Sequence, residues 1–270
     1  HISRQGDFGR VRLEAQDYGR ATFGQVVVAR DFGEALEARL AGLSQLTRYR
    51  PARFVDFAPD EAGHRALRIA DAEGERTLHA RLVVAADGTR SAVRAALGIG
   101  VDEHDYGQTL LVARVRATQA PDGTAYERLG DDGPTALLPR GDRHWGVVHG
   151  VAREQAETVA ALDDAAWLAR LQHAVGWRIG RLVASGERSA YPIVRVVAQR
   201  LVADRAVVLG NAAQTIHPIG AQGFNLGLRD ALTLAEEIAR GDDPGVASRL
   251  AAYAARRRED RERTLAFSDG

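Results

Sequence analysis

The segment from residue 205 to residue 230 carries the residue types best suited to hold a charged ligand. Its apolar start, 206–209, predicts a buried strand, and Gly210-Asn211 predicts a turn at the end of that strand. A glycine-rich loop and a helix start follow. Glycine lets the backbone adopt positive φ and approach a ligand closely, and the first N–H groups of a helix favour a phosphate or a group that develops negative charge. The pattern therefore predicts an anion-accepting loop whose permissive positions are Gly220, Gly223 and Gly227.

A second strand that runs into a turn lies earlier in the chain. Residues 80–86 are densely apolar, Asp87-Gly88 closes the run, and 91–97 has helical character. This order is typical of a buried parallel strand that feeds a helix. Two interpretations of Asp87 remain open: a turn residue that caps the helix, or a contact to a ligand.

The elements that must position these segments fall into two modules. Strand patterns with frequent turn signals dominate residues 106–199, which favours a mainly antiparallel sheet. The α/β pattern lies on both sides of it. We therefore predict an α/β fold, α+β overall, with one module formed by 1–98 and 200–270 and a sheet module, 99–199, inserted in it. Helical spacing predicts helices at 31–43, at 163–175 with Asp163 or Asp164 as N-cap, at 224–240 and at 245–263.

Two charged features of the last third of the chain have structural interpretations. The run 256–263 mixes arginines with acidic residues, which is typical of a solvated helix face rather than a binding patch. Asp230 is expected to cap, or to form a salt bridge within, its helical region.

The motifs at these two turns resemble those of the class A flavoprotein monooxygenases, within them the aromatic-ring hydroxylases of ubiquinone biosynthesis. That family's late motif is matched by Gly210-Asn211-Ala212-Ala213-Gln214, then Pro218, then Gln222-Gly223-Phe224-Asn225-Leu226-Gly227. Its middle motif is matched by Ala86-Asp87-Gly88-Thr89-Arg90-Ser91, and Arg30 is a weaker match. The resemblance covers nearly the whole chain, in order.

The resemblance implies an FAD/NAD(P)-binding Rossmann-like module and an antiparallel substrate module. It implies FAD as cofactor, NAD(P)H as reductant, and O2-dependent hydroxylation of a prenylated phenol through a flavin hydroperoxide. The backbone amides of Gln222, Gly223, Phe224 and Asn225 would stabilise negative charge at the pyrimidine end of the flavin.

The resemblance also assigns further residues. Pro218 would lie against the flavin ring, and Gly210-Asn211 on the ribityl chain. Asp87 and Gly88 would lie near the ribityl and pyrophosphate region, and Arg30 near the pyrophosphate. His217 is either a catalytic proton donor near the ring or a histidine packed beside Pro218.

The chain departs from the family pattern at four places. Asn211 replaces the usual Asp, so a ribityl contact would carry no charge, and Gln214 stands where much of the family has His. Gly220-Ala221 inverts the usual order, so either Ala221 adopts a positive φ at a cost of about 1 kcal/mol or more, or the turn shifts by one residue. Nothing before Arg30 matches the Gly-x-Gly-x-x-Gly fingerprint, and the chain has no Met, so a fragment is expected.

Composition excludes several other classes of protein. The 36 basic and 36 acidic residues cancel, which argues against nucleic acid as a partner. With no Cys and no ligand-type spacing of the eight His, we expect no metal site. No apolar run approaches the length of a membrane span, so we expect a cytoplasmic protein, with peripheral contact to the inner membrane or to a biosynthetic complex left open, as is an oligomer.

Two other functions remain as alternatives. One is a related hydroxylase of a soluble aromatic compound. The other is a non-catalytic protein that keeps the fold and serves as a scaffold in a biosynthetic complex.

Overall fold

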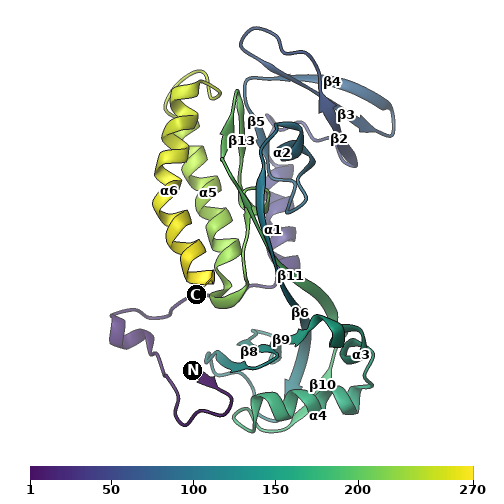
Figure 1. Cartoon of the computed structure of the whole chain (residues 1–270), viewed down its shortest axis with the longest axis vertical. Coiled ribbons are helices and arrows are strands. Elements are labelled where there is room, and N and C mark those ends of the chain that lie inside the picture. The colour runs from purple at the N-terminus through teal and green to yellow at the C-terminus, as the bar shows by residue number, and fades with distance from the viewer. Residues whose placement is uncertain (270) are drawn as a thin grey trace. The chain divides into compact units, whose positions relative to one another are not determined.

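The computed structural model describes residues 1–269, with side chains up to Ser268, and it divides into two compact units. We call residues 1–46 with 107–193 the sheet unit, and residue 47 to 106 with 194 onward the helix-pair unit. Two long strands, β6 (Val101–Ala117) and β11 (Ser189–Ala198), contribute residues to both units. Figure 1 traces these elements in chain order.

The helix-pair unit is built on two short parallel strands. β13 (Ala206–Val208) pairs in parallel with β5 (Val83–Ala85), and β12 (Val202–Ala203) pairs antiparallel with the other edge of β13. The β13 residues are fully buried, as expected for a strand covered on both faces. This observation confirms the mixed α/β class, and both strands lie where the apolar runs predicted them.

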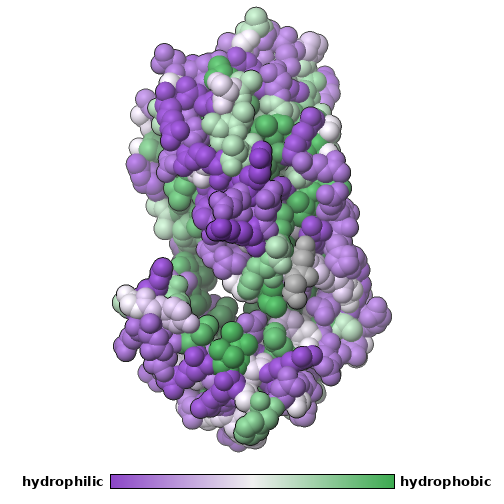
Figure 2. All heavy atoms as spheres, turned by 60° about the vertical axis from the view of Figure 1, so that its left-hand side comes forward, coloured by the Kyte–Doolittle hydropathy of each residue, from purple (hydrophilic) through white to green (hydrophobic). Residues whose placement is uncertain are grey.

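Two long helices lie side by side in this unit, α5 (Gln222–Ile238) and α6 (Ala247–Asp269), and Figure 1 shows the pair in light green and yellow. Leu234 of α5 and Tyr253 of α6 join the core formed by β5 and β13. The outer face of α6 comes forward in Figure 2, where it is largely hydrophilic. The short helix α2 (Ala92–Ala96) follows β5.

Further strands complete the helix-pair unit. β2 (Ala52–Phe57), β3 (Arg65–Asp71) and β4 (Gly74–Ala80) form an antiparallel sheet in that order. β14 (Gln214–Thr215) pairs antiparallel with Val196 and Val197 of β11. This last pairing fixes one end of the loop that follows β13.

The sheet unit is mainly antiparallel, as predicted for this part of the chain. β7 (Tyr126–Gly130), β8 (Gly133–Pro139), β9 (Trp145–Ala152) and β6 are neighbours in that order, with β10 (Leu182–Ser185) on β6. β1 (Ile2–Arg4) adds to β7 in parallel. The helices of this unit are α1 (Ala29–Ala41), α3 (Ala156–Ala160) and α4 (Asp164–Val175).

A buried core joins α4 to the sheet. Trp145, Leu111 and Val147 from the strands pack with Trp167 and Leu171 of α4, all at 1% exposure or less. The Asp163 side chain accepts a hydrogen bond from the Ala166 amide at 2.8 Å, which confirms Asp163 as the N-cap.

The boundaries between the units differ from the predicted module boundaries. They lie at 46/47, 106/107 and 193/194, and residues 1–46 group with the sheet rather than with the α/β elements. Which module holds the cofactor and which the substrate stays a prediction. Within residues 1–269, none of the helices combines the length and the apolar character that crossing a bilayer requires.

Candidate functional site

The turn after β13 presents Asn211 to solvent. Gly210–Ala212 form a 3-10 turn, in which Gly210 has φ +58° and the Asn211 side chain is exposed. Ala212 and Ala213, directly after it, are fully buried. Two buried alanines therefore anchor the turn while the amide beside them projects outward, at the carboxyl end of a parallel strand where α/β sheets bind ligands.

The Asp87 carboxylate is bonded to the helix that follows it. It accepts hydrogen bonds from the Ser91 hydroxyl and from the Val93 amide, the latter at 3.2 Å. Ser91 in turn caps α2 by accepting from the Arg94 amide at 2.9 Å. These bonds support the helix-capping interpretation of Asp87. A contact from Asp87 or Gly88 to a cofactor stays a prediction.

Arg94 ties the two predicted motifs together. This buried side chain donates to the Ala212 carbonyl at 2.7 Å and to the Thr89 carbonyl at 3.0 Å. The hydroxyls of Thr89 and Thr215 lie 2.7 Å apart. The structure therefore brings the turns after β5 and β13 into direct contact. Sequence reasoning missed Arg94, whose signal is a lone cation within the otherwise apolar run 92–96.

Two consecutive residues before α5 adopt the left-handed conformation. Gly220 has φ +70° and Ala221 has φ +53° and ψ +36°. The Ala221 amide donates to the Pro218 carbonyl at 2.9 Å, which closes a tight turn around the exposed Pro218. The inverted Gly-Ala order has therefore not shifted the turn, because Ala221 itself holds the positive φ.

The start of α5 has no side-chain cap. Its N-cap residue is Ala221, so no side-chain oxygen at that position accepts from the first helical amides, such as those of Gln222 and Gly223. Phe224 is 62% exposed, and the Asn225 side chain is exposed as well, with its amide donating to the Ala221 carbonyl at 3.4 Å. Uncapped N–H groups at the start of a 17-residue helix can donate to an external acceptor.

His217 is packed inside the loop. It is 9% exposed, and its Nδ1 accepts a hydrogen bond from the Ile219 amide at 3.2 Å. Because a backbone N–H can only donate, this Nδ1 carries no proton. The ring meets Tyr106 edge to face, with centroids 4.8 Å apart. This geometry supports the packed interpretation, and a proton-donor role for His217 stays a prediction.

Arg30 belongs to the other unit. It lies on α1, exposed, with its guanidinium 3.1 Å from Asp31. It lines a groove in the sheet unit together with Arg114, Arg140 and Asp142. The Arg140 guanidinium, hydrogen-bonded to Asp142, lowers the pKa of that carboxyl to about 2. Arg30 is the one predicted site residue outside the helix-pair unit, which contains all the others.

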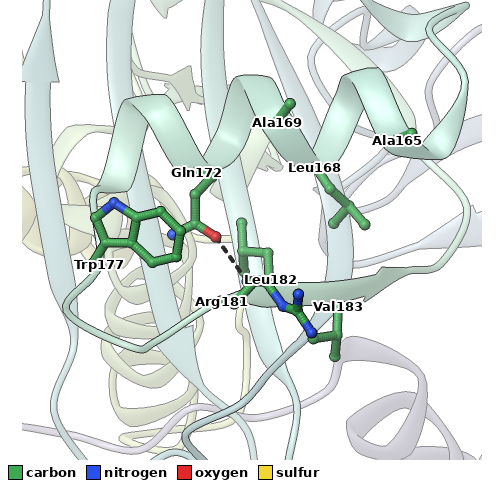
Figure 3. Close-up of a pocket in the computed structure, with 8 residues that line it drawn as sticks. All are labelled: Ala165, Leu168, Ala169, Gln172, Trp177, Arg181, Leu182 and Val183. Carbon is green, nitrogen blue, oxygen red and sulfur yellow. Dashed lines mark hydrogen bonds between the residues drawn. The ribbon is translucent and has the colours of Figure 1, made fainter.

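A second hollow of the sheet unit is formed between α4 and β10 (Figure 3). Gln172 closes part of it by accepting from the Leu182 amide at 2.8 Å. The residues that line it are Ala165, Leu168, Ala169, Gln172, Trp177, Arg181, Leu182 and Val183. No predicted site residue is among them.

Comparison with known proteins identifies relatives of the chain. It is 35% identical over 259 residues to the ubiquinone hydroxylase UbiL of Rhodospirillum rubrum, an alignment that covers 94% of this chain and 59% of that protein. It is 30% identical over 186 residues to the 3-demethoxyubiquinol 3-hydroxylase of Escherichia coli, covering 68% of this chain and 47% of that protein. The chain thus spans about half to three fifths of the length of these curated relatives.

A solved structure and a family description agree with these relatives. PqsL of Pseudomonas aeruginosa, a probable FAD-dependent monooxygenase, superposes with a TM-score of 0.73 at 25% identity, covering 88% of this chain and 67% of that one. The FAD binding domain family matches residues 5–268. The family expected from the two motifs is therefore confirmed: the chain belongs to the FAD binding domain family, among relatives that include ubiquinone hydroxylases.

Proposed function

We propose that the chain acts as an FAD-dependent monooxygenase that hydroxylates the aromatic ring of a prenylated phenol in ubiquinone biosynthesis. In this reaction one oxygen atom of O2 enters the ring and the other leaves as water, with NAD(P)H supplying two electrons. The observation that carries the proposal is the exposed Asn211 turn and uncapped start of α5 on one continuous segment, in a chain related to ubiquinone hydroxylases.

The residues of this loop fit the ribityl chain and the ring of FAD. The Asn211 amide is exposed at the carboxyl end of a parallel strand and can hydrogen-bond a ribityl hydroxyl. The first amides of α5 offer donors for the carbonyl groups of a flavin ring. Among the described residues, a Cβ at Gly223 would meet only Ile216 within 4 Å, at 3.7 Å, so this position leaves space that a close ligand can use. When bound, FAD supplies the redox and oxygen-activating chemistry that protein side chains lack.

Each residue of the loop then has a physical task. The amides of Gln222, Gly223, Phe224 and Asn225 stabilise negative charge that develops on the ring, because a helix start carries partial positive charge. Pro218, exposed on its closed turn, presents a rigid apolar surface to the ring. The unprotonated Nδ1 of His217 holds the Ile219 amide and so fixes that turn.

The proposal extends to surroundings and partners. A prenylated phenol resides in or beside a lipid phase, so we propose a cytoplasmic protein that contacts the inner membrane peripherally, alone or in a biosynthetic complex. No nucleic acid partner is proposed, because the 36 basic and 36 acidic residues balance.

Turnover with paired substrates tests this function. The FAD-loaded chain is given NADH or NADPH, O2 and either a short-chain prenylated phenol or the same phenol without its prenyl group. Mass spectrometry then follows the addition of one oxygen atom. We expect hydroxylated product from the prenylated phenol.

Hydroxylation of the unprenylated phenol alone would replace the substrate class by a soluble aromatic compound. Reduced nicotinamide consumed without hydroxylated product would contradict ring hydroxylation of these phenols. No consumption at all would contradict the enzyme and favour the scaffold. Arg258→Gln, on the exposed face of α6, serves as a control variant with unchanged turnover.

A further inference from the structure

A buried carboxylate of α5 holds the Asn211 turn from below. Asp230 is 1% exposed, and its Oδ2 accepts from the Gly210 amide at 3.1 Å and from the Gln214 side-chain amide at 2.6 Å. One oxygen therefore bonds Gly210, the first residue of the turn, and Gln214, two residues after its end. From the sequence, Asp230 is expected only to cap, or to form a salt bridge within, its own helical region. The two bonds to Gly210 and Gln214 reach beyond that region.

The charge of Asp230 is balanced by α6. Arg257, whose side chain is 5% exposed, donates from Nε to Asp230 Oδ1 at 2.7 Å and from Nη2 to Asp260 at 2.6 Å. A buried carboxylate without such a partner would be strongly destabilising. The arginine therefore allows an ionised carboxylate to lie beneath the loop.

Gln214 is held between an acceptor and a donor. Its Nε2 donates to Asp230, and its Oε1 accepts from Arg261 Nε at 2.9 Å. Arg261 also donates to the Ala198 carbonyl of β11 at 2.6 Å. The side-chain amide at 214 therefore links α5, α6 and β11 directly below the turn.

The bond to the Gly210 amide has a specific geometric consequence. Glycine adopts positive and negative φ about equally well, so the residue type at 210 does not by itself determine the φ of the turn. Gly210, the residue before Asn211, has φ +58°, and its N–H donates to Asp230. A Cβ at Gly227 would lie 3.2 Å from Gly210 Cα, so α5 also supports the turn by backbone contact.

We propose that Asp230 is a positioning residue for the cofactor: by accepting from Gly210 and Gln214 it fixes the Asn211 turn in the orientation that receives FAD, and Arg257 and Arg261 tie that turn to α6. This inference rests on the proposed function, because it takes FAD as the ligand of the turn. Asp230 itself is buried and makes no contact with the ligand.

An exchange of groups separates positioning from simple stability. Asp230→Asn removes the buried negative charge and leaves Arg257 without an anion at that site. Asp230→Asn combined with Gln214→Glu restores one carboxylate between Arg257 and Arg261. In this double variant the side-chain amide at position 230 donates to the carboxylate at position 214, and its single oxygen faces Arg257. The Gly210 N–H therefore still has no acceptor there.

The experiment measures urea unfolding, FAD affinity by flavin fluorescence, and the visible circular dichroism of bound flavin at saturation. We expect Asp230→Asn to lower both stability and affinity, the latter by about tenfold, as for one lost hydrogen bond to a charged group. The double variant should regain most of the stability while FAD affinity stays weak and the dichroism stays altered. Arg256→Gln, which breaks α6 contacts to Glu236 and Glu237 but none to the turn, is the matched control with unchanged affinity.

Recovery of FAD affinity in step with stability in the double variant would overturn the inference, as would wild-type affinity and dichroism in Asp230→Asn. These results would leave the proposed function intact, because wild-type binding provides the baseline. Absence of FAD binding by the folded wild-type chain would instead overturn the cofactor assignment, and this inference with it.

Discussion

Replacement of Ala221 by glycine should stabilise the protein, although glycine usually weakens a structure. Ala221 has φ +53° and ψ +36°, a conformation that costs a residue with a Cβ about 1–2 kcal/mol. Glycine removes that cost but gains conformational entropy in the unfolded chain, which costs about 0.4–1 kcal/mol. The difference predicts a net stabilisation of roughly 0.5–1 kcal/mol for Ala221→Gly.

Urea unfolding followed by far-ultraviolet circular dichroism measures this effect. We expect the midpoint of Ala221→Gly to rise with an unchanged slope, since the buried surface is the same. Ala235→Gly provides the matched control, because Ala235 is exposed within α5 and has helical geometry. There the same substitution should destabilise by about 1 kcal/mol. A destabilisation of similar size at both positions would refute the left-handed turn at 221.

Three further perturbations test other parts of the structure. Burial and the nearby Arg170 lower the pKa of His149 to about 4, so below pH 6.5 the unfolded chain binds more protons than the folded one. The free energy of unfolding should therefore fall by about 3 kcal/mol as the pH drops from 6.5 to 4. His149→Gln should flatten this dependence in urea unfolding across that range. Arg94→Met leaves two carbonyls without their donor and should destabilise by about 2 kcal/mol in the same assay, whereas an effect below about 0.5 kcal/mol would contradict the link between the turns. Gly227→Val places a side chain against Gly210 Cα and should weaken FAD binding more than Leu228→Val, an exposed neighbour.

The strand, loop and helix from 205 to 238 could be predicted because several independent signals agree there. A short apolar run, a glycine turn and helical spacing each identify one element, and the structure has β13, the turn and α5 in that order. The alternatives at Ala221 could be named but not decided, since local sequence does not report φ.

The run 256–263 shows where charge patterning fails. It was expected to be a solvated face, and for Arg258, Glu259, Glu262 and Arg263 this is correct. For Arg257 and Arg261 the prediction was wrong, because both turn inward to Asp230 and Gln214. A hydropathy scale assigns every arginine to the surface. Here a buried carboxylate on the neighbouring helix α5 determines which arginines of α6 are directed inward. The available signal was helical spacing: Leu250, Tyr253, Arg257 and Thr264 share the buried face.

The boundaries between the two units could not be located from turn signals in the sequence. Two of the three divisions, at 106/107 and 193/194, fall inside the continuous strands β6 and β11. Gly107, with φ +64°, lies directly at one division, yet β6 continues through it, so a turn-type residue there does not end the strand. Turn and breaker residues indicate where helices and strands end. They do not indicate a boundary between units that falls within one strand.

Titration of the chain with FAD tests the central claim most directly. Flavin fluorescence and the visible spectrum are followed for the wild-type chain, Gly223→Val, Asn225→Ala and the surface control Arg258→Gln. The loop and the uncapped start of α5 predict saturable binding that Gly223→Val abolishes, Asn225→Ala weakens and Arg258→Gln leaves unchanged. A folded wild-type chain without saturable binding, or binding that Gly223→Val leaves unaffected, would contradict the assignment of this loop as the flavin site.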